Sequence, residues 1–93
     1  MYIVSYDFES NRRRSRFSNF LKKFGRRIQY SIFEIRNSPR VLKNILTEVE
    51  MEYEPHFTNS DSIIIMHVCE TCKGKVKRYG YAANEEESVV VFE

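Results

Sequence analysis

The chain has 93 residues, of which 42% are hydrophobic and 30% are charged. This length allows one small domain, and this composition indicates a globular chain rather than a disordered one. No apolar run reaches the roughly 18–20 residues needed to span a bilayer, and no secretory leader is evident. We therefore expect a cytoplasmic protein with reduced cysteines and no membrane association, and a core this small favours dimerisation.

The net charge of +2 conceals a split between the two halves of the chain. Residues 1–43 contain eleven Lys and Arg against three Asp and Glu, whereas residues 44–93 contain four against ten. Such asymmetry is typical of a basic face that meets a polyanion. Uneven scatter of charge in a small protein is the plainer alternative.

The first half of the chain predicts a strand over residues 2–8 and a helix over residues 11–24. An apolar stripe at helical spacing consists of Phe17, Phe20, Leu21 and Phe24. A polar stripe on the same helix consists of Arg12, Arg16, Asn19 and Lys23. Gly25 follows where a residue of positive φ commonly ends a helix.

Residues 28–36 are strand-like but contain no Gly or Pro to mark a turn. Either the chain reverses near Tyr30 and Ser31, or this is one bent strand and a fourth strand comes later. Ser38 and Pro39 predict the start of a second helix that runs to Tyr53.

The C-terminal part predicts further strands. The apolar residues 62–68 indicate a strand covered on both faces. A short strand is expected over residues 76–81, and a last strand over residues 88–92 needs an edge to pair with, in this chain or another. The predicted fold class is therefore α+β, with two helices on one face of an antiparallel sheet in the ferredoxin-like βαββαβ order.

Asp7 ends the first strand and is the candidate metal ligand and catalytic residue. A lone carboxylate at a strand end is often only a turn former. Mg²⁺, however, takes one or two protein carboxylates and completes its shell with water and phosphate oxygens. One Asp7 per chain would suffice if a two-fold axis brought two copies together.

Four arginines at the start of the first helix oppose the helix dipole, which disfavours cations there. Broken local rules tend to mark function, and the arginine fork matches phosphate. A solvated basic face is the alternative. The candidate nucleic-acid-binding residues are Arg12, Arg13, Arg14, Arg16, Lys23, Arg26 and Arg27.

Two weaker features leave alternatives open. Cys69 and Cys72 with His67 resemble half a zinc site, which would need His56 or a second chain, or they are ordinary residues at a strand end. The aromatic side chains of Tyr6, Tyr30 and Phe33 could stack on bases or pack under the helices.

These residues together resemble the CRISPR-associated protein two family, the small non-integrase subunit of the spacer-acquisition complex. The resemblance rests on four motifs in order over residues 1–36: Tyr6-Asp7, the arginine block, Leu21-Lys22-Lys23-Phe24-Gly25, and Gln29-Tyr30-Ser31-Ile32-Phe33-Glu34. It does not cover the pair Cys69 and Cys72.

The resemblance implies a ferredoxin-like domain over residues 1–83 and a homodimer in which residues 84–93 pair with the partner's sheet. It implies Mg²⁺ held at Asp7 and a nuclease activity on RNA or DNA. It also implies a scaffold role in CRISPR adaptation, with double-stranded DNA and the CRISPR integrase (CRISPR-associated protein one) as partners. The rival functions are a stand-alone, toxin-like endoribonuclease and a single-strand RNA-binding module.

Overall fold

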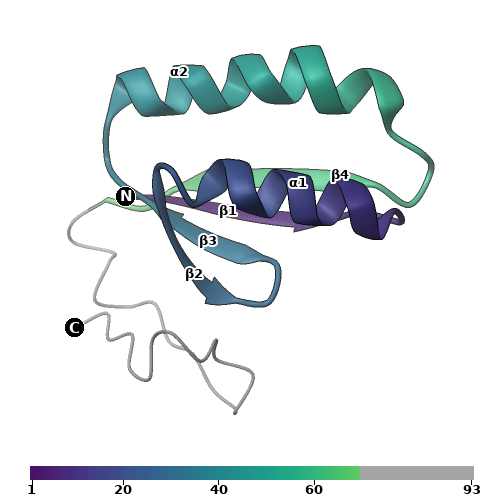
Figure 1. Cartoon of the computed structure of the whole chain (residues 1–93). Coiled ribbons are helices and arrows are strands. Elements are labelled where there is room, and N and C mark those ends of the chain that lie inside the picture. Colours follow the sequence, from purple (N-terminus) through teal and green to yellow (C-terminus); the bar gives the residue numbers. More distant parts are fainter. Residues whose placement is uncertain (70–93) are drawn as a thin grey trace.

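The computed structural model describes residues 1–69 and shows two helices packed on a sheet (Figure 1). The elements in chain order are β1 (Tyr2–Asp7), α1 (Asn11–Leu21), β2 (Gly25–Gln29), β3 (Ile32–Ile35), α2 (Pro39–Glu48), a π-helical turn η1 (Val49–Tyr53), a 3₁₀ turn η2 (Glu54–His56) and β4 (Ser62–His67). The strands expected over residues 76–81 and 88–92, the segment 84–93 and Cys72 lie outside the described residues.

The sheet has the order β2-β3-β1-β4, and every neighbouring pair is antiparallel. With one helix after β1 and one after β3, this is the ferredoxin-like arrangement that the sequence predicts. The chain does reverse at Tyr30 and Ser31, so the hairpin alternative is correct and the bent strand is wrong. The turn is held to β1 because the N–H of Tyr6 donates to the carbonyl of Ser31 at 3.1 Å.

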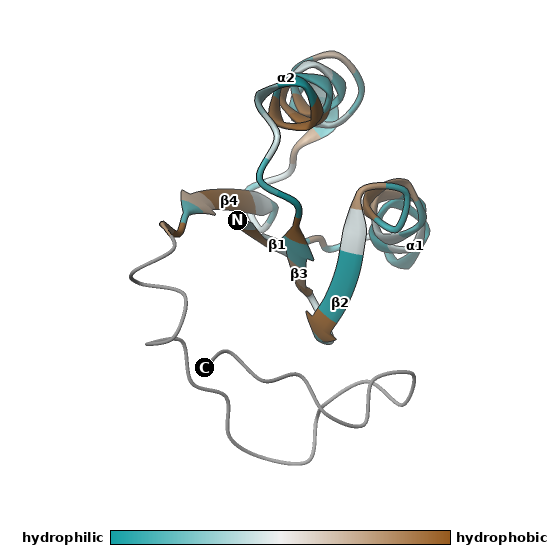
Figure 2. Cartoon of the chain, turned by 90° about the vertical axis from the view of Figure 1, so that its left-hand side faces the viewer, coloured by the Kyte–Doolittle hydropathy of each residue, from teal (hydrophilic) through white to brown (hydrophobic). Residues whose placement is uncertain are grey.

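Both helices cover the same face of the sheet (Figure 2). Val4, Tyr6 and Phe33 project from the sheet into the core beneath them, and Phe17 and Ile45 meet these residues from α1 and α2. Each of these side chains is buried. Full burial of an apolar side chain contributes roughly 1.5–3 kcal/mol, so this aromatic core holds the two layers together.

α1 begins as the sequence predicts and ends earlier. Ser10 is the N-cap, and its side chain accepts from the N–H of Arg13 at 3.3 Å. The helix ends at Leu21 rather than Phe24, because the chain turns through residues 22–24 into β2.

Gly25 does not have the positive φ that we expected; it is the first residue of β2. A Cβ at this position would lie 1.9 Å from the carbonyl oxygen of Glu34. Glycine is therefore needed for the close approach of β2 to β3, and its role as a helix end is a wrong prediction.

α2 starts at the predicted place. Ser38 is the N-cap and accepts from the N–H of Val41 at 3.3 Å, with Pro39 at the first helical position. The regular helix stops at Glu48, and the π-helical turn carries the chain to Tyr53. The wider turn places Tyr53 in the core, where it is 1% exposed.

β4 is not covered on both faces within the described part of the chain. Ile63 and Ile65 pack against the main core, whereas Ile64 and Met66 are 55% and 49% exposed. Because successive residues of a strand face opposite sides, the face of β4 away from the helices remains apolar and open. The prediction of two covered faces is thus wrong for residues 1–69.

Candidate nucleic-acid interface and metal ligand

Four segments meet at one end of the sheet: the end of β1, the start of α1, the β2–β3 turn and the start of β4 (Figure 1). The first two of these segments carry Asp7 and the arginine block. The other candidate residues lie between the end of α1 and the first residues of β2, and they are Lys23, Arg26 and Arg27. The antiparallel register brings Asp7 opposite Ser62, and the turn residue Ser31 lies beside Tyr6. Asp7 and the start of α1 thus lie at the same end of the sheet, with Asp7 on the face away from the helices.

Asp7 is exposed at the end of β1. By strand alternation it lies with Ile3 and Ser5 on the face of the sheet away from the helices, here called the open face, on which Ile3 is nevertheless buried. Among the described residues, no group of three or more His, Cys, Asp or Glu is placed to hold a metal ion. One accessible carboxylate per chain fits half of a shared site, and residues 1–69 of a single chain do not complete one.

Arg13 points into the protein. Its guanidinium pairs with Oδ2 of Asp61 at 2.9 Å and donates to the carbonyl of His56. Asp61 also accepts from the backbone N–H groups of Glu9 at 2.8 Å and Thr58 at 2.9 Å. The pKa of Asp61 is lowered from its ordinary value, chiefly by the hydrogen bond from the N–H of Glu9. The hydrogen bond from Thr58 and the charge of Arg13 add to this effect.

Arg14 is also committed to the fold. Its guanidinium donates to the carbonyl of Phe8 at 2.7 Å and to the side chain of Asn11. These contacts close the turn between β1 and α1. Two of the four arginines in the block therefore have structural partners, which spacing alone did not indicate.

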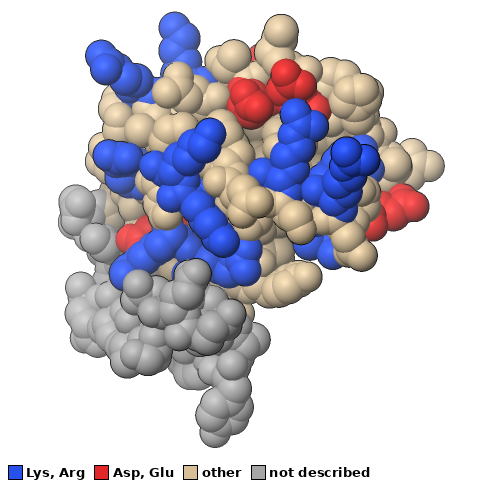
Figure 3. All heavy atoms as spheres, viewed as in Figure 1, with Lys and Arg blue, Asp and Glu red and all other residues tan. Residues whose placement is uncertain are grey.

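Arg12 and Arg16 on α1 and Lys23 in the turn that follows the helix are exposed, and these three residues are here called the basic flank. Arg16 lies over the Tyr53 ring at 5.9 Å, and Lys23 lies over the Phe20 ring at the same distance. Neither contact covers the cationic head, and no ion pair to these three residues forms within the described chain. Lys and Arg side chains gather over α1 and the hairpin, and a group of acidic side chains lies over the second half of α2 (Figure 3).

The two arginines of β2 differ in environment. Arg26 is exposed and pairs with Glu34 across the hairpin at 3.1 Å. Arg27 is partly buried: it donates to Oγ of Ser18 at 2.5 Å and lies 5.4 Å from the centre of the Phe33 ring. Arg27 thus connects the hairpin to α1.

The sheet aromatics do not form a stacking surface. Tyr6 and Phe33 are 3% and 0% exposed beneath the helices, whereas Tyr30, in the hairpin turn, is 65% exposed. Burial raises the pKa of Tyr6, partly opposed by the nearby Arg27. The side-chain arrangement therefore does not support a module that reads single-stranded RNA across its sheet.

His67 is exposed at the end of β4, with its ring centre 5.0 Å from that of Tyr2. Cys69 is exposed, and Cys72 lies beyond the described residues. His56 belongs to η2, next to the loop that carries Asp61. The half-site predicted at His67, Cys69 and Cys72 thus stays a prediction.

Sequence reasoning missed two sets of residues. Asp61 was not singled out because its partners are far away in the chain. A second polar flank of α1 was missed as well: Arg14, Ser18 and Lys22 lie at i, i+4 and i+8 and face the hairpin. That spacing was visible in the sequence and could have revealed the flank.

Comparison with known proteins adds family information. The model of the family "CRISPR associated protein Cas2" matches residues 1–76. The chain is 25% identical over 89 residues to a CRISPR-associated endoribonuclease Cas2 of Methanospirillum hungatei, covering 96% of both chains. It is 50% identical over 34 residues to a CRISPR-associated endoribonuclease Cas2 of Thermus thermophilus, covering 37% of this chain and 36% of that one.

Solved structures resemble the fold over most of its length. A hypothetical protein of Thermus thermophilus, TT1823, superposes with a TM-score of 0.71 at 28% identity, covering 89% of this chain and 93% of that one. Streptococcus pyogenes Cas2 superposes with a TM-score of 0.68 at 23% identity, covering 85% and 98%. No helix among residues 1–69 is both long and apolar enough to cross a bilayer.

Proposed function

Because this chain belongs to the CRISPR associated protein Cas2 family, we propose that it acts in CRISPR adaptation as a dimeric scaffold that binds double-stranded DNA. Its partners are a second copy of the chain and the CRISPR integrase, CRISPR-associated protein one. The observation that supports DNA binding is the basic flank, in which Arg12, Arg16 and Lys23 are all exposed.

A row of cations on a helix surface suits a duplex better than a small ligand. Duplex DNA carries about one phosphate charge per 1.7 Å of axis, and proteins bind it by releasing counterions from several phosphates. Arg12 and Arg16 lie one helical turn apart on this flank, so their side chains can reach separate phosphates. The ring of Tyr53 beneath Arg16 supports its guanidinium without neutralising it.

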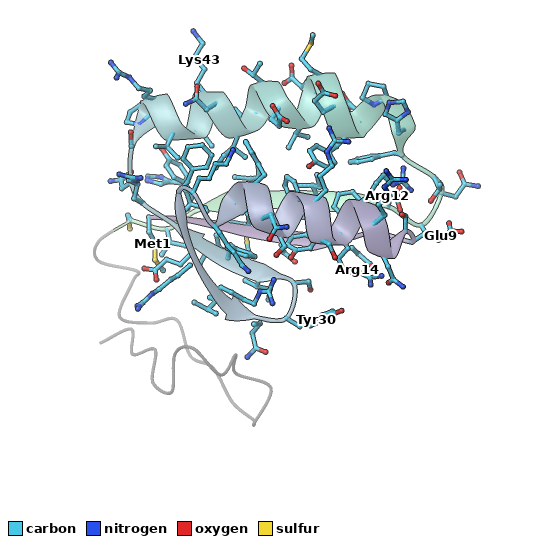
Figure 4. The ribbon with its side chains drawn as sticks, in the orientation of Figure 1. Met1, Glu9, Arg12, Arg14, Tyr30 and Lys43 are labelled. Carbon is cyan, nitrogen blue, oxygen red and sulfur yellow. The ribbon has the colours of Figure 1, made fainter. Side chains whose placement is uncertain are left out.

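The test is the salt dependence of duplex binding by a double variant, Arg12→Ala with Arg16→Ala. We expect weaker binding and a shallower plot of log K against log salt, by about 0.9 for each phosphate that the variant no longer neutralises. The matched control is Arg40→Ala with Lys43→Ala, which removes two exposed cations from α2. Lys43 points away from the sheet, on the far side of α2 from α1 (Figure 4). Equal effects of the two double variants would overturn the proposed DNA-binding face.

The open face of the sheet supports the homodimer. It presents Ile64 and Met66, both about half exposed, beside the buried cluster of Met1, Ile3 and Ile28. Removing such apolar surface from water favours association. Asp7 lies on the same face, so a two-fold axis there would bring two Asp7 carboxylates towards each other.

A second candidate function is a Mg²⁺-dependent nuclease activity, in the scaffold or in a stand-alone, toxin-like endoribonuclease. The observation that favours it is the exposed Asp7 on the sheet face where we place the dimer interface. Relatives carry the names endoribonuclease and endonuclease, so both RNA and DNA are candidate substrates. Two Asp7 side chains would hold the ion, which would supply charge neutralisation at the phosphodiester. The residues fit that role only as a pair, because each chain offers one carboxylate.

Replacing Asp7 with Ala tests the nuclease. Cleavage by the purified protein should disappear, while duplex affinity should stay the same or rise because a negative charge is lost. Glu50→Ala, an exposed carboxylate on η1, is the control and should leave cleavage unchanged. Cleavage that survives Asp7→Ala would exclude this residue as the metal ligand. Co-purification with the integrase separates the scaffold from the stand-alone enzyme.

A further inference from the structure

A cavity of about 280 Å³ lies between α1 and the β2–β3 hairpin, separate from the basic flank. α1 contributes Arg14, Ser18 and Lys22 to its wall, and the sheet side contributes Tyr6, Arg27 and Tyr30. Arg14 and Tyr30 are seen on the same side of α1 (Figure 4), and Lys43 is on the opposite side of the molecule.

The charge of this cavity is one-sided. Three of its lining residues are cations, and none is Asp or Glu. Arg14 and Arg27 are held by hydrogen bonds to the carbonyl of Phe8 and to Ser18. A guanidinium that is already fixed loses little side-chain entropy on binding, which favours an anionic ligand with several acceptor oxygens.

The hydroxyl of Tyr6 is a second and independent indication of a ligand. The Tyr6 residue is 3% exposed and lines this cavity. Burial raises the pKa of Tyr6, so the hydroxyl stays protonated at neutral pH and can donate. Ser18 and Arg27 lie close enough to lower that pKa, yet the hydroxyl forms no hydrogen bond of acceptable geometry within residues 1–69. A buried donor without an acceptor is costly, and a ligand oxygen would relieve that cost.

Size and the exposed Tyr30 narrow the class of ligand. Pockets for small molecules span about 300–1,000 Å³, and this cavity lies just below that range, so it suits one small unit at most. Tyr30 is 65% exposed in the hairpin turn, where its ring offers a surface for a base. We propose that the cavity binds a single nucleotide unit, with its phosphate among Arg14, Lys22 and Arg27 and its base on Tyr30.

The phosphate could belong to a free nucleotide or to the 5′ end of a strand, and the experiment separates the two. Calorimetric titrations at physiological salt would use adenosine 5′-monophosphate and a short single strand with and without a 5′-phosphate. We expect saturable binding of the mononucleotide, of the phosphorylated strand in preference to the unphosphorylated one, or of both. Saturation by the mononucleotide identifies a free nucleotide as a ligand, and a preference for the phosphorylated strand identifies a strand end.

Three variants and one control test the placement. Lys22→Ala removes a cation from the cavity, whereas Lys43→Ala removes an exposed cation on the opposite side of the molecule (Figure 4). We expect Lys22→Ala to weaken binding at least roughly fivefold and Lys43→Ala to leave it unchanged. Tyr30→Ala should cost at least roughly fivefold because the ring on which the base stacks is removed.

Tyr6→Phe removes only the hydroxyl and keeps the ring that packs 5.1 Å from Phe17. A structural role of the hydroxyl predicts lower stability and unchanged affinity. The proposed role predicts unchanged or higher stability and roughly tenfold weaker binding. No saturable binding of either probe, or equal effects of Lys22→Ala and Lys43→Ala, would overturn the proposal. Duplex binding is tested with variants of Arg12 and Arg16, which do not line this cavity. Either proposal can therefore fail without contradicting the other.

Discussion

The guanidinium of Arg13 lies 2.9 Å from the Asp61 carboxylate, and this ion pair ties the first turn of α1 to the residue that precedes β4. The Asp61 side chain is fully covered, and its other oxygen accepts the N–H of Glu9. A second contact links the same two segments: the hydroxyl of Thr58 donates a hydrogen bond to the Glu9 carboxylate at 3.0 Å. Arg13 therefore serves the fold, although its place in the arginine block predicts a role in binding.

Arg13 and Arg12 should separate stability from binding. Arg13→Ala leaves the covered Asp61 without its cation, so we expect the Tm to fall by roughly 4 °C or more, measured by thermal unfolding. Arg12→Ala, on the exposed flank, should leave the Tm within about 2 °C and weaken duplex binding. A stable Arg13→Ala protein with impaired DNA binding would show that the ion pair to Asp61 is dispensable.

Asp61→Asn should change the pH dependence of stability. The pKa of Asp61 is held below its ordinary value of 3.8, chiefly by the N–H of Glu9. The charged form thus stabilises the folded state at every pH above 3.8, and that contribution is lost as the pH falls through the lower folded pKa. Urea unfolding should find the wild type more stable than the variant at pH 7, with the gap shrinking below about pH 4. A gap independent of pH would mean that the charge of Asp61 contributes nothing.

Gly25→Ala should destabilise the hairpin. The added Cβ would lie 1.9 Å from the carbonyl oxygen of Glu34, which belongs to the backbone and has no free rotation. Relief requires β2 to move away from β3, at a cost of about 1–3 kcal/mol or more, measured by chemical unfolding. The control is Asn37→Ala, because Asn37 is exposed and its replacement should leave the free energy of unfolding nearly unchanged. Phe24→Ala is unsuitable because Phe24 packs against the core.

The fold was largely accessible from local patterns in the sequence. Phe17 and Leu21 at helical spacing, the cap Ser38 and the alternating strand around Val4 each predict what the structure shows. The hairpin turn at Tyr30 is fixed by tertiary pairing to β1 instead of by a Gly or Pro, and so its position was ambiguous. The role of Gly25 was predicted wrongly because glycine is required there by close contact with Glu34 of β3, a strand that comes later in the chain.

The candidate site was accessible in outline only. Composition indicates that the start of α1 is basic, but helical position alone cannot say which arginines have partners. Arg13 pairs with Asp61, which only the approach of a distant segment brings close, and Arg14 is held by the carbonyl of Phe8 across the turn that precedes α1. Of the four arginines in the block, only Arg12 and Arg16 therefore belong to the basic flank.

Ile64→Asp tests the open face of the sheet as the dimer interface. Ile64 is 55% exposed and lies opposite Ser5 on β1, so a charge there would be desolvated if two such faces met. We expect the wild type to sediment as a dimer and the variant as a folded monomer. The affinity between two copies of the chain should fall by at least roughly tenfold. Leu46→Asp is the matched control: Leu46 is 40% exposed on α2, and a charge there should leave the dimer intact. If Ile64→Asp dimerises like the wild type, the open face is not the dimer interface. The shared metal site is then excluded as well, because Asp7 has no second carboxylate beside it.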